Sequence, residues 1–131
     1  MQRLQQQLDF IIELDKLKSV IRRSPLINGQ RHENSAEHSW HIALMAFVLA
    51  EHSQEPIDVL RTIKMLLVHD IIEIDAGDTY CYDDEGYKDK IERERRAADR
   101  LFGELKTDQA GTLRALWEEF EAGETTHDKV A

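Results

Sequence analysis

The sequence predicts an all-α protein, a helical bundle of about six helices, and three observations support this fold class. Only two prolines and six glycines interrupt 131 residues, so long helices with short connections are expected. Apolar residues recur every three or four positions through several segments, which is the spacing of one helix face. No segment alternates polar and apolar residues as a half-buried strand would. At this length we expect a single domain that spans residues 1–131.

The first helix is predicted to run to about Val20. Six apolar residues recur at roughly helical spacing and indicate an amphipathic helix: Leu4, Leu8, Ile11, Ile12, Leu14 and Leu17. Ser24-Pro25 and Asn28-Gly29 follow, and both pairs are typical of turns. We therefore expect a loop between this helix and the next.

The next two helices are predicted to form the interior. Asn34 is a suitable N-cap, with Glu37 as its capping-box partner, for a helix that runs to about His52. This segment is apolar on nearly every side, which predicts a central, buried helix. Pro56 fits the first position of another buried helix, which would end at His69.

The C-terminal half is expected to contain more strongly charged helices. The predicted elements are, in order, an acidic and aromatic loop over residues 78–86, a charged helix over 87–105, a helix over 108–122 and the start of a final helix at Thr125-Thr126. Gly77 ends the segment that follows His69, and Thr107 is the expected cap of the helix over 108–122. The final helix is truncated at Ala131.

Composition excludes several classes of function. The net charge is −9, which disfavours a nonspecific grip on a nucleic-acid polymer. A single cysteine, Cys81, rules out an intramolecular disulfide and suits a reducing cytoplasm. The longest nearly uncharged run, residues 38–50, is too short to span a membrane. We therefore expect a cytoplasmic protein with no membrane partner.

Three side chains on the two predicted interior helices indicate a metal site. His38 lies in the first turn of one helix, and His69 and Asp70 lie at the end of the next. Antiparallel helices joined by a short connection bring these two ends together. Two imidazoles and a carboxylate suit one divalent ion of Mn, Fe, Co, Ni or Zn, with positions left for water or substrate.

A plainer interpretation stays open beside the metal site. A histidine-aspartate pair is common, and both histidines can be packed, metal-free core residues. The carboxylates nearby favour a metal, because four acidic groups at the end of a core helix repel one another unless a cation or solvent intervenes. These four are Asp70, Glu73, Asp75 and Asp78.

Three segments in this order resemble the HD-domain metal-dependent phosphohydrolases. They are residues 33–40 (ENSAEHSW), 69–73 (HDIIE) and 76–79 (AGDT). The branch that looks most similar contains the bacterial 5′-deoxynucleotidases. The resemblance implies a helical bundle that binds one divalent metal, hydrolyses phosphomonoesters, typically of nucleotides, and forms a homodimer.

The resemblance also assigns roles to individual residues. The metal ligands of the family match three positions, which are His38, His69 and Asp70. Glu73 matches a carboxylate beside the attacking water, and Asp78 matches the group that protonates or stabilises the leaving oxygen. Arg23 matches an arginine that holds the substrate phosphate, a role that suits a planar and permanently charged side chain.

The sequence departs from the family pattern in two places. The family takes a fourth metal ligand, an aspartate, from a helix after a Glu-Thr motif; here Glu124-Thr125 is present, but the sequence ends at Ala131, before the matching position. Either the sequence is truncated, or a tail is omitted, or the protein lacks this ligand. The segment 79–84 also lacks the proline-containing stretch associated with selection of deoxynucleotides, which leaves the substrate open.

Two functions follow, from different classes. The first is a metal-dependent phosphohydrolase that uses metal-activated water to cleave a small phosphomonoester, a (deoxy)nucleoside 5′-monophosphate. The alternative is a catalytically weak or inactive HD module that binds metal or nucleotide as a sensor or dimeric scaffold.

Three further residues near the predicted site have simpler expected roles. We favour a supporting role for His41, core or dimer packing for Trp40, and a solvated loop for Glu33.

Overall fold

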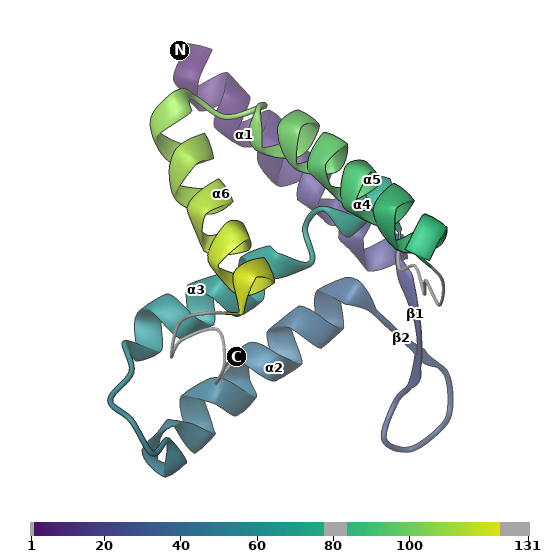
Figure 1. The fold of residues 1–131 in the computed structure, drawn as a ribbon, viewed down its shortest axis with the longest axis vertical. Helices are drawn as coiled ribbons and strands as arrows, with labels where there is room; N and C mark the ends of the chain where they lie inside the picture. Colours follow the sequence, from purple (N-terminus) through teal and green to yellow (C-terminus); the bar gives the residue numbers. More distant parts are fainter. Residues whose placement is uncertain (1, 78–83, 124–131) are drawn as a thin grey trace.

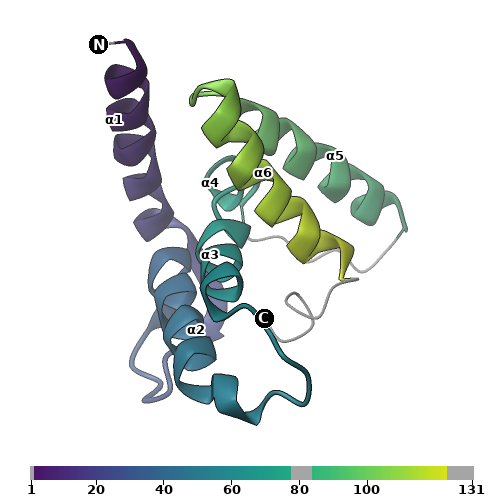
Figure 2. The same ribbon diagram turned by 90° about the vertical axis from the view of Figure 1, so that its left-hand side faces the viewer.

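The computed structural model describes residues 2–77 and 84–123, and its elements are mainly helical, so the predicted fold class is confirmed. In chain order the elements are α1 (Gln2–Leu14), a 3₁₀ turn (Asp15–Ser19), β1 (Ile21–Pro25), β2 (His32–Asn34), α2 (Ser35–Leu49), a 3₁₀ turn (Ala50–His52), α3 (Val59–His69), α4 (Glu73–Ala76), α5 (Asp84–Phe102) and α6 (Thr107–Ala122). Helix α3 packs against α2 on one side and α6 on the other (Figures 1 and 2). None of the described helices has both the length and the apolar character that a bilayer crossing requires.

The hydrophobic core lies mainly between α1, α3, α5 and α6. Its fully buried large side chains include Met65 on α3 and Leu101 and Phe102 on α5. Phe10 of α1 and Trp117 of α6 belong to the same cluster. This core anchors α3, the helix that ends at His69.

A short hairpin stands where the sequence analysis expects a loop without strands, so that expectation is wrong here. Strands β1 and β2 pair antiparallel, with Ile21 opposite Asn34 and Pro25 opposite His32. Gly29 adopts a φ of 72° in the connecting turn, a left-handed conformation that glycine reaches without strain. The strands are short and their register is irregular, so no alternation of polar and apolar residues reveals them in the sequence.

Helix α2 is not the fully buried central helix that its composition predicts. It buries only a stripe of small residues, Ser35, Ser39 and Ala43, and it packs against α3. Four large apolar residues at helical spacing form what we call the α2 stripe, and each exposes 44–67% of its surface: Trp40, Leu44, Phe47 and Val48. Small residues let two helices approach closely, so α2 meets α3 through them while the large side chains face outward.

The other helix boundaries differ by a few residues from those predicted. Helix α1 gives way to a 3₁₀ turn at Asp15, and α3 begins at Val59 rather than at Pro56. The side chain of Asp58 caps α3 by accepting a hydrogen bond from the Arg61 backbone N–H. Residues 78–83 and the predicted final helix at Thr125-Thr126 lie outside the described residues.

Candidate metal centre

His38, His69 and Asp70 converge as the sequence predicts. One ligand atom from each lies within 4.8 Å of the others, a group that can hold a metal ion. The packing of α2 against α3 produces this arrangement, because it places the first turn of α2 beside the last turn of α3. His69 and Asp70 are buried, and His38 is partly buried.

The tautomer of His69 is fixed by the backbone. Its Nδ1 lies 2.6 Å from the Leu66 carbonyl oxygen and donates to it, so the neutral ring carries its lone pair on Nε2. That Nε2 lies 3.0 Å from Oδ1 of Asp70, which is also an acceptor. Burial is the main cause that lowers the pKa of His69, so the doubly protonated ring is disfavoured. A metal cation held by His69 and Asp70 would satisfy both acceptors.

His38 is oriented by Glu33. Its Nδ1 lies 3.0 Å from Glu33 Oε1, the carboxylate support that metal-bound histidines commonly have. The pKa of His38 is lowered, first by burial and then by the nearby Arg22, so its ring is neutral and able to bind a metal. The sequence analysis expects Glu33 in a solvated loop because it does not predict strand β2, which holds Glu33 beside His38.

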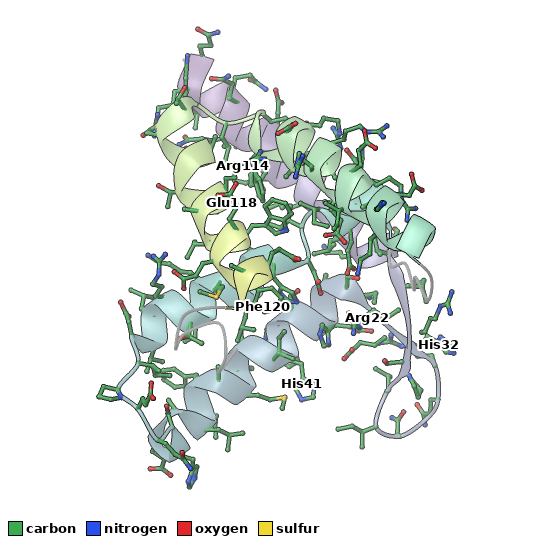
Figure 3. The ribbon with its side chains drawn as sticks, in the orientation of Figure 1. Arg22, His32, His41, Arg114, Glu118 and Phe120 are labelled. Atoms are coloured by element: carbon green, nitrogen blue, oxygen red, sulfur yellow. The ribbon has the colours of Figure 1, made fainter. Side chains whose placement is uncertain are left out.

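Of the two adjacent arginines, Arg22 is the one beside the ligand group. Its Nη1 lies 3.6 Å from Asp70 Oδ2, and its Nε lies 3.6 Å from Glu33 Oε1. Figure 3 shows Arg22 reaching the site from the hairpin, across from Phe120 on α6. Arg23, the predicted phosphate ligand, is exposed, because neighbouring residues of a strand point to opposite faces. The way the hairpin packs therefore decides which of the two arginines lies beside the ligand group.

Glu73 lies at the edge of the same site. Its Oε2 accepts a hydrogen bond of 2.7 Å from the Ser35 hydroxyl. A cavity of about 270 Å³ adjoins it and is lined by side chains that include His69, Asp70, Glu73, Lys90, Glu94 and Glu121. Burial raises the pKa of both Glu94 and Glu121. Asp78, predicted to act on the leaving oxygen, lies outside the described residues.

One aromatic ring contacts the ligand group, and a second aromatic pair lies outside it. The Phe120 ring packs on the His69 ring with centroids 4.4 Å apart, which limits rotation of the imidazole. His41, expected to support the site, stacks on Trp40 with ring centroids 6.2 Å apart. Among the described residues His41 is not part of the ligand group.

Comparison with known proteins agrees with this geometry. A family model described as HD domain matches residues 14–131. The chain belongs to the HD-domain family. Two relatives are named 5′-deoxynucleotidase HDDC2: that of Homo sapiens is 30% identical over 123 residues, and that of Bos taurus is 31% identical over 123 residues.

A solved structure is similar to this HD-domain protein over most of its length. The crystal structure of a "predicted metal-dependent phosphohydrolase" from Magnetospirillum magnetotacticum MS-1 is 53% identical, with a TM-score of 0.89. The match covers 98% of this chain and 66% of that one. A conserved hypothetical protein from Pyrococcus furiosus is 27% identical with a TM-score of 0.69, over 94% of this chain and 69% of that one.

The chain spans a little under three fifths of the length of the curated human and bovine relatives. The matches to the human and bovine proteins cover 93% of this chain in each case, but 59% and 58% of the relatives.

Proposed function

We propose that this protein is a metal-dependent phosphohydrolase that cleaves a small phosphomonoester, a (deoxy)nucleoside 5′-monophosphate. The observation that carries the proposal is the convergence of two neutral imidazoles and a carboxylate, His38, His69 and Asp70, within 4.8 Å. The names of the relatives, 5′-deoxynucleotidase and metal-dependent phosphohydrolase, support the substrate class and the reaction.

One divalent metal, of Mn, Co, Fe, Ni or Zn, is proposed as the cofactor. The donor set fits these ions, because imidazole nitrogen and carboxylate oxygen are ligands that they share. His38, His69 and Asp70 would hold the ion. When bound, such an ion supplies Lewis acidity toward a phosphoryl oxygen and makes a coordinated water more acidic.

The remaining side chains act on the substrate and on protons. Arg22 is proposed to hold the phosphate, because its guanidinium lies beside the ligand group and is a permanent cation suited to phosphate oxygens. Arg23 stays the alternative that the family pattern implies. Glu73 is proposed to orient the attacking water and accept its proton, and Asp78, from the motif alone, to protonate the leaving oxygen.

The proposal extends to assembly and location. The exposed α2 stripe supports a homodimer, because an apolar patch of adjacent large side chains is typical of an interface. The single cysteine supports a cytoplasmic location, and the net charge of −9 argues against a nucleic-acid polymer as partner. Residues 1–131 are proposed to form one HD domain.

Phosphate release tests the activity. The protein is freed of metal with a chelator, reloaded separately with each of the five metals, and assayed against ribo- and deoxyribonucleoside 5′-monophosphates. We expect turnover with at least one metal, none after chelation, and a loss of at least about a thousandfold for Asp70→Ala, which removes a ligand. Absence of turnover with every metal and nucleotide would refute the proposal.

A further inference from the structure

Ser35 is held more rigidly than a serine at a helix start requires. It is fully buried, and its backbone N–H donates to the Val20 carbonyl oxygen at 2.9 Å. The preceding Asn34 already caps α2: its side chain accepts from the Glu37 N–H at 2.9 Å, and Glu37 accepts from the Asn34 N–H at 2.7 Å. The Ser35 hydroxyl is therefore not needed as a cap.

The hydroxyl of Ser35 instead reaches across the fold to α4. It donates to Glu73 Oε2 at 2.7 Å, over 38 positions of sequence. Ser35 and His38 are three residues apart in the first turn of α2, and residues at this spacing lie on one side of a helix. One turn thus carries both a proposed metal ligand and the group that contacts Glu73.

We propose that Ser35 is a positioning residue for Glu73. By fixing Oε2, its hydrogen bond sets the direction of the carboxylate and therefore of Oε1, the second oxygen. Because Ser35 and His38 belong to the same rigid turn, the carboxylate is held at a constant distance from the ligand group. The inference rests on the proposed function, in which Glu73 orients the attacking water and accepts its proton. In this inference, Ser35 sets the orientation of the Glu73 carboxylate without touching the substrate.

Steady-state kinetics of Ser35→Ala, with the metal and nucleotide that support turnover, test the inference. We expect kcat to fall on the order of tenfold to a hundredfold with little change in KM, because binding groups are untouched while the base is misplaced. In the Glu73→Gln background, the same substitution should add little further loss, because the two residues act as a unit.

Ser39→Ala is the matched control. Ser39 is also a buried serine of α2, one turn later, and its hydroxyl has no hydrogen-bond partner among the described residues. This variant should keep kcat within about twofold of the wild type, because it removes a hydroxyl that makes no hydrogen bond among the described residues. An equal loss of kcat in both serine variants, or a Ser35→Ala loss that multiplies with that of Glu73→Gln, would overturn the inference.

Crystal structures of the wild type and Ser35→Ala separate this inference from the proposed function. We expect the Glu73 carboxylate to leave its present position in the variant while the His38 and His69 rings stay in place. If Glu73 does not move, the inference is wrong even when turnover is present. If Glu73 moves but the wild type cleaves no nucleotide with any metal, the proposed function has failed, and the catalytic role of Ser35 fails with it.

Discussion

The proton on Nδ1 of His69 has consequences for the whole site. Because the Leu66 carbonyl accepts this proton, Nε2 is committed as a lone-pair donor toward the centre of the group. Glu33 similarly occupies Nδ1 of His38 and leaves its Nε2 for a ligand role. Two independent supports thus prepare both imidazoles in the protonation state that a metal needs, before any metal is present.

Metal affinity should therefore tolerate mild acid. Burial lowers the pKa of both His38 and His69 below the usual value of 6.5, so protons compete with the metal only at a lower pH than for exposed histidines. We expect the Kd for Mn²⁺ or Co²⁺, measured by titration calorimetry, to stay nearly constant from about pH 8 to 6.5 and to rise below that. A Kd that already rises tenfold between about pH 8 and 7 would contradict this.

The same lowered pKa values determine how the stability of the metal-free protein changes with pH. A lowered pKa means that the unfolded chain, with ordinary histidines, takes up protons before the folded protein does. As the pH falls below about 6.5, these two histidines therefore reduce the free energy of unfolding of the metal-free protein.

Arg22 and Arg23 can be separated by a pair of matched variants. We expect Arg22→Ala to lower kcat/KM for the nucleotide by about tenfold to a thousandfold, because it removes the cation that lies 3.6 Å from Asp70. Arg23→Ala, at an exposed position of the same strand, should change kcat/KM by less than about threefold. The measurement is phosphate release at varied substrate concentration. The reverse order of effects would restore the role to Arg23, as the family pattern implies.

The residues of the site differ in how well the sequence reveals them. His38, His69 and Asp70 are predictable because each lies on a helix with a clear start or end, and antiparallel packing then brings them together. Glu33 and Arg22 are not, because their placement depends on two short strands that leave no periodic signal. Sequence spacing alone cannot decide which of two adjacent arginines faces inward.

At the scale of elements, the start of α2 is the junction on which the site depends. The capping box of Asn34 and Glu37 ends β2 and begins α2, so Glu33 lies just before the junction and His38 just after it. This start is readable from the sequence because the capping pattern is local. How much of α2 is buried cannot be predicted from the sequence, because it depends on which face of the helix meets α3.

Asn34→Ala should weaken this junction. Loss of an asparagine N-cap lowers the free energy of unfolding by about 1 kcal/mol, measured by urea denaturation of the metal-free protein. Metal affinity should fall as well, because the first turn of α2 carries His38. Gln54→Ala, at an exposed position after α2, is the control and should match the wild type in both measurements. An unchanged denaturation midpoint for Asn34→Ala would show that the cap contributes nothing.

At the scale of the whole molecule, the uneven burial of α2 bears on assembly. Its small-residue face is occupied by α3, while the α2 stripe presents Trp40, Leu44, Phe47 and Val48 on one exposed side. Single exposed apolar residues are ordinary, but a contiguous row of large ones is typical of a covered surface. The sequence predicts apolar surroundings on nearly every side of α2, but within the described residues only its small-residue face is buried. The sequence does not indicate which apolar side chains of α2 stay exposed in a single chain.

A charge in the middle of the α2 stripe should prevent the proposed homodimer. Phe47 exposes 64% of its surface, so Phe47→Glu costs the folded monomer little, whereas burying an unpaired carboxylate in an interface costs several kcal/mol. We expect wild-type protein to sediment as a dimer, and the variant to dimerise at least about a hundredfold more weakly with an unchanged circular dichroism spectrum. Ile27→Glu, at an apolar residue of the hairpin turn that is 97% exposed and lies outside the stripe, is the control and should remain dimeric. A monomeric wild type at about micromolar concentration, or equal weakening by both variants, would rule out a homodimer formed through this face.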